Sequence, residues 1–378
     1  MTVKLRGKID SSNAAKTEAE INEQIAGCND EIIIDAAGLE YISSAGLRVI
    51  LRVNKAHAST KVINCSPAVY EIFNVTGFTE IIDITKAYRK ISVDGCKVMG
   101  VGANGIVYRL SPDTVIKVYK NRDSLDEIQN ERDLARKAFV MGVPTAIPYD
   151  VVQVGDLYGS VFELLEAKSF AKLINRGESV EELAKQSVDI LKTMHSAKLR
   201  DGELPDKKAE AMSWANCAAD ALPDEVGAKL KALFNDIPNT NNMLHGDFHI
   251  KNIRRQNGEN LIIDMATLSM GHPVFELAAI FGAYIGYGCI DKEVCSDFLG
   301  ITDEQCSDFW KYTVKYYFDG ESQNQLDKTL KIIETVCSVQ LLWWMLVFPD
   351  ELKNSDKIIE FCKSYLTENL PKLDKLYF

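Results

Sequence analysis

The residues best placed to do chemistry lie in the stretch HGDFHIKN at residues 245–252 and at Asp264, which follows the apolar residues 260–263. An acid, Asp247, precedes an amide, Asn252, and a second acid ends the apolar run. This order suits phosphoryl transfer, in which one acid orients the attacking hydroxyl while an amide and an acid hold Mg²⁺ against phosphates. The alternative is an ordinary polar loop, because His, Asp and Asn are common in loops.

A second candidate stretch lies upstream, where Gly100, Gly102 and Gly105 have the spacing G-x-G-x-x-G. Glycines at this spacing permit a tight hairpin whose backbone can close over phosphates. A dinucleotide-binding fold uses the same spacing but needs a helix that opens at the third glycine. The residues after Gly105 are instead β-branched and aromatic, which predicts a second strand and favours a kinase-type hairpin.

Lys117 follows Gly105 by twelve residues and stands in a predicted strand. A lysine flanked by β-branched residues at this spacing suits a phosphate anchor, and the alternative is a solvent-facing lysine on an edge strand. The charged stretch at residues 124–140 predicts a helix, on which Glu131 is the preferred acid for orienting Lys117. Glu127, one turn earlier, is the alternative, and most charges on such a helix are merely solvated.

A further strand is predicted within residues 159–166, where it runs into a linker. In this layout the backbone near Glu163 and Leu165 would hydrogen-bond the edge of a nucleotide base. An ordinary strand explains these residues equally well.

Length and composition predict two or three packed domains in a soluble, cytoplasmic protein. The chain has 378 residues, 46% of them hydrophobic, and a net charge of −11, which argues against nucleic acid or anionic membrane as a partner. Nine cysteines are scattered without a C-x-x-C pair, which indicates reduced thiols. The N-terminus lacks the apolar core of a signal peptide. The apolar residues 339–348 are too few to span a bilayer, so we expect a buried helix there.

Residues 1–88 alternate strand and helix signals, which indicates an α/β layer. A strand ending at Asp35 is followed by a short loop and by Ser43 and Ser44 at the start of a helix over residues 44–58. A serine at this place caps a helix, which is the interpretation that the residues favour. The same place tolerates a phosphate, because N–H groups and the helix dipole point at it. Strands are expected over residues 2–6, 31–36, 61–64 and 81–84, and the other helices over residues 13–25 and 68–75.

The sequences YISSAGL at residues 41–47 and GKID at residues 7–10 resemble the STAS domain of anti-sigma-factor antagonists. In that family the serine after the motif aspartate is phosphorylated by a partner kinase. The position corresponds to Ser44, and the family's aspartate is replaced by Ser43. The resemblance covers residues 1–88 and implies a regulatory domain with a protein partner and a phosphosite at Ser44. The short polar stretch at residues 87–92 is expected to connect this domain to a close neighbour.

The second part resembles the aminoglycoside phosphotransferase and choline kinase branch of the protein-kinase-like superfamily. The His-Gly-Asp form of the loop, LKTMHS at residues 191–196 and GHPVFELA at residues 271–278 carry this resemblance. It implies an α+β bilobal kinase-like fold, with an N-lobe at residues 95–166 and a helical C-lobe at residues 167–378. The residues that stand in kinase order are Gly100, Gly102, Gly105, Lys117, Glu131, Asp247, Asn252 and Asp264.

The resemblance implies that Asp247 is the catalytic base, that Asn252 and Asp264 bind Mg²⁺, and that Lys117 anchors the phosphates of ATP or GTP. The family's two aspartates after the glycine of GHPVFELA are replaced by His272 and Glu276, which we expect to support the fold of the catalytic loop. Met265 stands where protein kinases have phenylalanine, and no Ala-Pro-Glu segment follows. An activation loop controlled by phosphorylation is therefore not expected.

In this branch the C-terminal helices line the acceptor pocket. Aromatic residues together with acids could hold a cationic ligand there, and core packing is the alternative. The candidate residues are Trp310, Tyr312, Tyr316, Tyr317, Phe318, Trp343, Trp344, Asp308, Asp319 and Glu334.

Together these patterns predict an ATP- and Mg²⁺-dependent phosphotransferase acting on the hydroxyl of a small molecule, with a STAS-like regulatory domain. One alternative is a signalling protein whose kinase-like part phosphorylates Ser44 in its own chain or in a partner. Another is a nucleotide-sensing interaction module that transfers nothing. The intact Asp247, Asn252 and Asp264 count against the last, because a scaffold does not need them.

Overall fold

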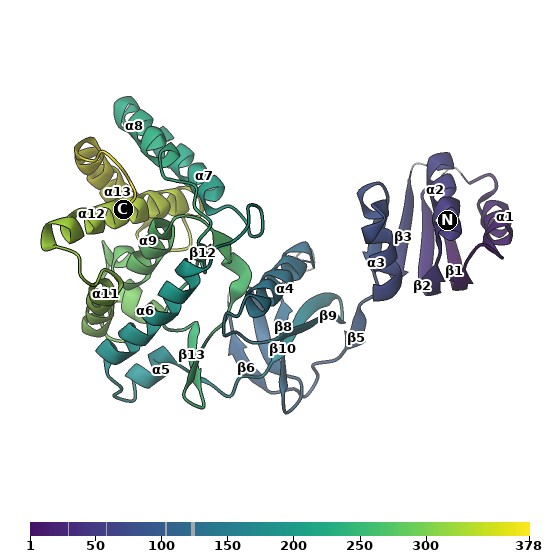
Figure 1. The fold of residues 1–378 in the computed structure, drawn as a ribbon, viewed down its shortest axis with the longest axis horizontal. Coiled ribbons are helices and arrows are strands. Elements are labelled where there is room, and N and C mark those ends of the chain that lie inside the picture. The colour runs from purple at the N-terminus through teal and green to yellow at the C-terminus, as the bar shows by residue number, and fades with distance from the viewer. Residues whose placement is uncertain (29, 58, 103, 122–124) are drawn as a thin grey trace. The chain divides into compact units, whose positions relative to one another are not determined.

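The computed structural model describes the chain except for residues 29, 58, 103 and 122–124 (Figure 1). The predicted helix ends that fall on Ala58 and Ser124 therefore lie outside the described residues. Two compact units are present, one formed by Met1–Ser92 with Val151–Asp156 and the other by Val93–Asp150 with Leu157–Phe378. Each unit has a hydrophobic core of its own.

The first unit is an α/β layer built on a four-stranded parallel sheet in the order β1-β2-β3-β4. Apolar side chains alternate along the strands, and one stripe of each helix is buried, so the strands and helices share a single core. This confirms the α/β fold predicted from the strand and helix alternation. The elements are β1 (Thr2–Ile9), α1 (Ala14–Ile25), β2 (Ile32–Ile42), α2 (Ser44–Ala56), β3 (Thr60–Cys65), α3 (Pro67–Val75), the 3-10 turn η1 (Phe78–Glu80) and β4 (Asp83–Lys86).

The loop predicted after Asp35 is wrong, because β2 continues through it to Ile42. The continuation pairs with β1 up to the contact of Ile9 with Ile42, and shifts in register absorb the irregularity in between. At Gly38 a Cβ atom would lie 2.9 Å from the backbone oxygen of Leu5, so only glycine allows this close approach. Local polarity suggested a loop, and pairing with a distant strand overrides it.

The polar connection at residues 87–92 contains a strand, β5 (Arg89–Ile91), which sequence analysis did not predict. It pairs in parallel with residues 152–154 at the end of β9 (Pro148–Val154). The backbone groups of this short segment are therefore held by a ladder of hydrogen bonds rather than left to solvent.

The second unit begins with a sheet in which β10, β8, β7 and β6 lie side by side in that order. The hairpin of β6 (Val98–Val101) and β7 (Gly105–Arg109) carries the glycine stretch, and β8 (Thr114–Tyr119) carries Lys117. The helix α4 (Leu125–Val140) packs against β10 (Leu157–Glu163). The predicted kinase-type hairpin, with strands on both sides of the glycines, is thus present.

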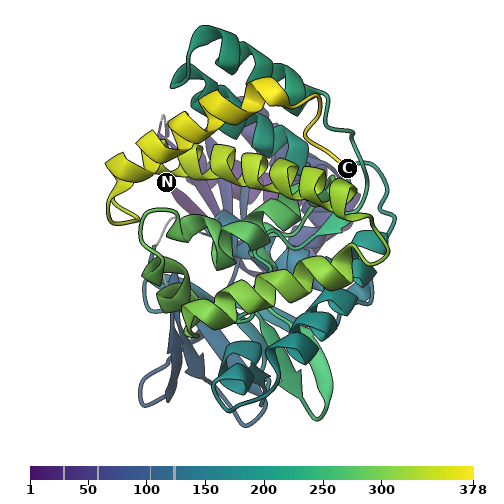
Figure 2. The ribbon, with the colours of Figure 1, turned by 90° about the vertical axis from the view of Figure 1, so that its left-hand side faces the viewer.

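The rest of the second unit is mainly helical, and Figure 2 looks onto these helices. Two small sheets, formed by β11, β13 and β14 and by β12 and β15, lie among them. The strands are β11 (Lys168–Ser169), β12 (Met243–Leu244), β13 (Ile253–Gln256), β14 (Glu259–Ile262) and β15 (Ser269–Met270). The helices are α5 (Phe170–Ile174), α6 (Val180–Ser196), α7 (Lys207–Asp220), α8 (Asp224–Asn235), η2 (Met265–Thr267), α9 (Pro273–Tyr284), η3 (Gly286–Gly288), α10 (Glu293–Leu299), α11 (Asp303–Tyr317), α12 (Gln323–Val347), α13 (Ser355–Asn369) and η4 (Leu370–Lys372).

The apolar run at residues 339–348 forms the end of α12 and its C-cap, Phe348, and the helix has 25 residues, more than the run itself suggested. By length and composition α12 is the one helix among the described residues that could cross a membrane. Its most apolar window is 56% buried inside the second unit, where it packs on α7, α9 and α13. Helices at the centre of a protein core have this composition as well.

Gly46 of α2 offers a test of packing in the first unit. A Cβ atom there would lie 2.7 Å from Ile42 Cγ1 and 2.8 Å from Ile9 Cγ2, and both isoleucines are buried. Overpacking costs roughly 1–3 kcal/mol, whereas alanine in place of glycine gains about 1 kcal/mol of helix propensity. We expect Gly46→Ala to destabilise the unit, so that β1 and β2 amides exchange hydrogen faster in mass spectrometry. Arg48→Ala, on the exposed side of α2, is the control that should leave exchange unchanged.

Candidate active site

The loop at residues 245–252 is anchored at its start by Glu276 of α9. The backbone N–H groups of His245 and Gly246 both donate to the Glu276 carboxylate. Gly246 has a φ of +84°, and a Cβ atom on it would lie 2.6 Å from the backbone oxygen of Thr267. The Thr267 hydroxyl in turn donates to His245 O at 2.8 Å. Glycine is therefore required between the histidine and the aspartate, which explains the His-Gly-Asp form of the loop.

Glu276 is an almost fully buried carboxylate, with 1% of its surface exposed. Burial raises its pKa, but the His195 ring and the N–H of Gly246 outweigh burial and hold the pKa below the ordinary 4.5. His195 Nε2 lies 3.8 Å from Glu276 Oε2, and its Nδ1 is 2.7 Å from the Tyr317 hydroxyl. The ionised carboxylate thus receives two backbone donors in a place that water does not reach.

His272 caps α9, because its Nδ1 accepts the backbone N–H of Val274 at 3.1 Å. Burial lowers the pKa of His272 to about 4, so the ring stays neutral and can accept at neutral pH. The ring packs edge-on against Phe378, with 5.1 Å between the centroids. Glu276 and His272 therefore both hold the structure around the loop, as sequence analysis expected of them.

Asp247 follows the anchored turn and is held by two donors. Asn252 Nδ2 donates to Asp247 Oδ2 at 2.9 Å and to its backbone oxygen at 3.0 Å. His249 Nε2 lies 3.3 Å from Asp247 Oδ1. Burial raises the pKa of Asp247, but the hydrogen bonds from His249 and Asn252 outweigh it, so the pKa lies below its ordinary value. The side chain is still 47% exposed.

Asp264 lies two residues beyond the last residue of β14, Ile262, and faces the lysine of β8. The backbone N–H of Ile263 donates to Asn252 O at 3.0 Å, and His245 Nε2 is 3.1 Å from Ile263 O. These contacts join the end of the strand to the catalytic loop. Asp264 has a φ of +69°, and its Oδ1 lies 4.0 Å from Lys117 Nζ.

Lys117 forms its closest ion pair with Glu131 of α4, the residue that sequence analysis preferred to Glu127. The Nζ atom lies 2.8 Å and 3.0 Å from the two carboxylate oxygens. The hydroxyl of Tyr119 donates to the same carboxylate at 2.6 Å. Burial, and then the charge of Glu131, raise the pKa of Tyr119, so this hydroxyl keeps its proton. Tyr119 had no predicted role, although its place two residues after Lys117 in a strand puts both on one face.

The three glycines of the hairpin differ in how tightly they are packed. A Cβ atom on Gly105 would lie 2.5 Å from the backbone oxygen of Val118, whereas one on Gly102 would meet only Gly105 O at 3.8 Å and one on Gly100 nothing within 4 Å. The N–H of Gly102 donates to Gly105 O at 2.9 Å. Gly105 is thus needed for strand packing, while Gly100 and Gly102 leave open space beside the backbone.

Glu163 and Leu165, the predicted base-binding residues, lie at and just beyond the end of β10. The N–H of Glu163 donates to Ile147 O at 3.0 Å, and its carboxylate accepts the N–H of Ile147 at 3.2 Å. The N–H of Leu164 donates to Asp113 O at 2.8 Å. The ladder therefore ends here, and Leu165 is half-buried outside it.

Asn252 and Asp264 offer oxygen ligands, which Mg²⁺ prefers. Because Asn252 uses its amide nitrogen for Asp247, its amide oxygen remains for a cation. The described residues contain no group of three or more His, Cys, Asp or Glu that could hold a metal ion. Mg²⁺ that is shared with substrate phosphates needs only one or two protein ligands, so the donor set fits this ion.

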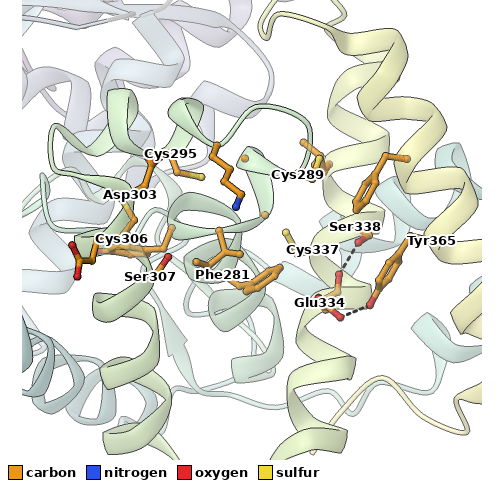
Figure 3. Close-up of a pocket in the computed structure, with 18 residues that line it drawn as sticks. Phe281, Cys289, Cys295, Asp303, Cys306, Ser307, Glu334, Cys337, Ser338 and Tyr365 are labelled. Atoms are coloured by element: carbon orange, nitrogen blue, oxygen red, sulfur yellow. Dashed lines mark hydrogen bonds between the residues drawn. The ribbon is translucent and has the colours of Figure 1, made fainter.

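A cavity of about 510 Å³ lies among the C-terminal helices (Figure 3). Of the aromatic and acidic residues predicted to form an acceptor pocket, only Glu334 is among its described lining residues. Most aromatic side chains of that set instead pack against the core, for example Trp343 on Trp214 and Trp344 on Tyr287. Core packing, the alternative, explains these aromatic residues. The cavity is lined instead by Phe281, Tyr284, Phe361, Tyr365, Asp303, Glu304, Lys292 and the thiols of Cys289, Cys295, Cys306 and Cys337, with others.

The two serines of the first unit have different environments. Ser43 is the N-cap of α2, and its hydroxyl accepts the N–H of Gly46 at 3.5 Å. Ser44 is the first helical residue and is exposed. The capping role therefore belongs to Ser43, and Ser44 lies at the end of the helix where N–H groups and the dipole favour an anion.

Comparison with known proteins accounts for both units. Residues 96–290 match the phosphotransferase enzyme family, and residues 1–92 match the STAS domain. The chain belongs to the phosphotransferase enzyme family. It carries a STAS domain at its N-terminus, where it is 36% identical over 87 residues to "Putative anti-sigma factor antagonist BtrV" of Bordetella bronchiseptica. That match covers 22% of this chain and 75% of the relative.

Solved structures of aminoglycoside phosphotransferases have a similar fold. The ADP-bound APH(2'')-Ib is 14% identical, with a TM-score of 0.50, over 82% of this chain and 99% of that chain. A thermostable mutant of APH(4)-Ia, in a ternary complex with ADP and hygromycin B, is 14% identical, with a TM-score of 0.50, over 74% and 94%. At such identities the likeness shows the kinase-like fold, which confirms the predicted fold of the second unit.

The buried carboxylate of Glu276 gives a pH-dependent prediction. Because its folded-state pKa lies below the ordinary 4.5, its contribution to stability is complete above that value and is lost as the pH falls through the folded-state pKa. We expect Glu276→Gln to unfold about 1–3 kcal/mol more easily at pH 7. The difference should shrink as the pH falls below 4.5 and through the folded-state pKa. Urea unfolding followed by tryptophan fluorescence measures both. Glu351→Gln, at an exposed position, is the control, and a gap independent of pH contradicts the assignment.

Proposed function

We propose that the protein transfers the γ-phosphate of ATP or GTP to a hydroxyl group of a small molecule. The observation that carries this proposal is the convergence of two clusters in the second unit. One is the ion pair of Lys117 with Glu131, and the other is the pair of Asp247 with Asn252. Asp264 Oδ1 lies 4.0 Å from Lys117 Nζ, and Ile263, the residue before it, donates its backbone N–H to Asn252 O, so this segment connects the two clusters.

Each side chain has a distinct task in this reaction. Glu131 holds the Lys117 ammonium, which binds phosphate oxygens, and the open backbone at Gly100 and Gly102 lets phosphates approach. Asn252 and Asp264 would hold Mg²⁺, which neutralises charge that develops on the phosphates.

Asp247 orients the acceptor hydroxyl by accepting its hydrogen bond. The lowered pKa keeps Asp247 ionised at neutral pH, so an acceptor site is always available to the hydroxyl. A carboxylate with a low pKa is a weak base. This suffices, because the transition state of phosphoryl transfer is loose and the proton leaves the hydroxyl late.

The nucleotide base would lie against the end of β10. There the carbonyl of Glu163 and the N–H of Leu165 are the backbone groups next to the point where the ladder ends. The kinase-like structures of similar fold include APH(2'')-Ib with ADP bound. This supports a nucleotide as the donor in this chain.

The cavity among the C-terminal helices is the proposed place for the acceptor. Among the described lining residues, Asp303, Glu304 and Glu334 outnumber the one ammonium group, Lys292. Lys331 pairs with Glu334 at 3.1 Å, and the two remaining acids still favour a cation. Its wall includes Gly286 and Gly288 on either side of Tyr287. Tyr284, which also lines the cavity, accepts the backbone N–H of Ile250 at 3.1 Å through its hydroxyl, so the cavity wall contacts the loop that carries Asp247. A cationic amino alcohol or amino sugar fits this environment.

The STAS domain would regulate the transfer through a protein partner, in the cytoplasm. A second function is favoured by one observation, the exposure of Ser44 at the N-terminus of α2. In it, the phosphotransferase domain phosphorylates Ser44 of its own chain or of another copy.

The first function predicts that phosphoryl transfer depends on Asp247. In a screen of nucleotide consumption against amino alcohols, sugars, nucleosides and aminoglycosides, Asp247→Asn should lower kcat by about 10²–10⁴-fold, because it removes the acceptor of the hydroxyl proton. Asp236→Asn, at an exposed position at the end of α8, should leave kcat unchanged. Equal rates in wild type and Asp247→Asn contradict the proposal.

The second function predicts that label from [γ-³²P]ATP enters the protein itself. The label should be absent in Ser44→Ala and in Asp247→Asn. It should persist in Ser43→Ala, because Ser43 is occupied as the helix cap. Transfer to a small molecule with no labelled protein favours the first function alone, and label that survives in Ser44→Ala excludes this phosphosite.

A further inference from the structure

The ring of His249 has a defined polar contact at each nitrogen. Its Nδ1 accepts the backbone N–H of Lys251 at 3.3 Å. A ring nitrogen that accepts a hydrogen bond carries no proton, so the proton of the neutral ring lies on Nε2. Nε2 is 3.3 Å from Asp247 Oδ1. The proton on Nε2 therefore faces the Asp247 carboxylate at a distance that allows donation.

The ring has little freedom to leave this place. His249 is buried, and Phe298 of α10 packs edge-on against it, with 5.0 Å between centroids and 87° between planes. Lys251 contacts the same phenylalanine, since its Nζ donates to Phe298 O at 2.9 Å and lies 4.8 Å from the ring centroid. Phe298, near the end of α10, thus contacts both His249 and Lys251, the residue whose N–H binds the imidazole.

His249 and Asn252 contact different oxygens of the Asp247 carboxylate. Asn252 Nδ2 donates to Oδ2 at 2.9 Å, and His249 donates to Oδ1. One donor on each oxygen fixes the plane of the carboxylate, which would otherwise rotate about its last bond. The exposed side of Asp247 keeps lone pairs for a hydroxyl that approaches from solvent.

We propose that His249 is a positioning residue for phosphoryl transfer, which donates from Nε2 and, with Asn252, holds the Asp247 carboxylate in the orientation that receives the acceptor hydroxyl. This inference rests on the proposed function. His249 does not relay the proton of the acceptor, because Nε2 already carries a proton and Nδ1 is engaged by Lys251.

Two substitutions separate positioning from packing. Gln places an amide donor close to the position of Nε2, whereas Leu fills the space without a donor. With the acceptor found in the screen, or with water as acceptor, His249→Leu should lower kcat about 100-fold, the cost of a misplaced reacting group. His249→Gln should recover most of this loss, and the KM for nucleotide should be unchanged in both.

Combination with Asp247→Asn sharpens the test. If His249 acts only through the Asp247 carboxylate, His249→Leu should cause no further loss of activity in the Asp247→Asn background. Equal losses in the Leu and Gln variants, or losses that multiply in the double variant, would show a purely structural role and overturn the inference.

The proton position can be measured without any turnover. In protein labelled with ¹⁵N-histidine, the His249 signals are assigned by their absence from the His249→Gln spectrum. The inference expects a protonated Nε2 and an unprotonated Nδ1, and the reverse tautomer overturns it. Wild-type protein that turns over no acceptor and no water overturns the proposed function, and the inference with it. An active enzyme with an unaffected His249→Leu variant overturns the inference alone.

Discussion

The candidate active site depends on the burial of a single charge, the carboxylate of Glu276. A charge in the interior is tolerated only when donors surround it. Here the donors are the N–H groups of His245 and Gly246, the first residues of the catalytic loop. Because the carboxylate needs these two N–H groups, it fixes where the loop begins, and the positive φ of Gly246 then turns the chain toward Asp247.

The two histidines of the loop, His245 and His249, make the same type of local hydrogen bond. In His245 and in His249, Nδ1 accepts the backbone N–H two residues later, which places the ring proton on Nε2. His245 directs that proton to the backbone oxygen of Ile263, and His249 directs it to Asp247. One imidazole therefore joins the loop to Ile263, the residue before Asp264, and the other faces the Asp247 carboxylate, which we propose it positions. In each ring, a local backbone contact at Nδ1 thus decides that Nε2 is the nitrogen that can donate a hydrogen bond.

The STAS domain and the phosphotransferase domain differ in the contacts that shape their candidate sites. The STAS domain is a parallel sheet with helices, stabilised by alternating buried side chains, and its exposed Ser44 is free of the capping task that Ser43 performs. In the phosphotransferase domain, polar contacts between distant segments set the site, such as Lys117 of β8 with Glu131 of α4. A regulatory signal at Ser44 would add charge at a helix end without disturbing the cap.

Much of the fold and part of the site were predictable because their signals are local or have fixed spacing. The glycine hairpin, the lysine strand, the acid of α4 and the loop with its amide each follow from residue types at short separations. The alternation of strand and helix predicted the α/β domain for the same reason. The order of these pieces along the chain indicated a kinase-like fold, since each piece alone is common in proteins.

Tertiary structure alone decided which residues meet across long separations. The pairing of β1 with β2 turned an expected loop into strand, and the packing of α11 and α12 placed most of the predicted acceptor aromatics against the core. The role of His249 was invisible in the sequence, because it depends on the Lys251 amide and on Phe298 of a later helix. A sequence determines what each side chain can donate, accept or bury. The fold determines which partner lies within reach of it.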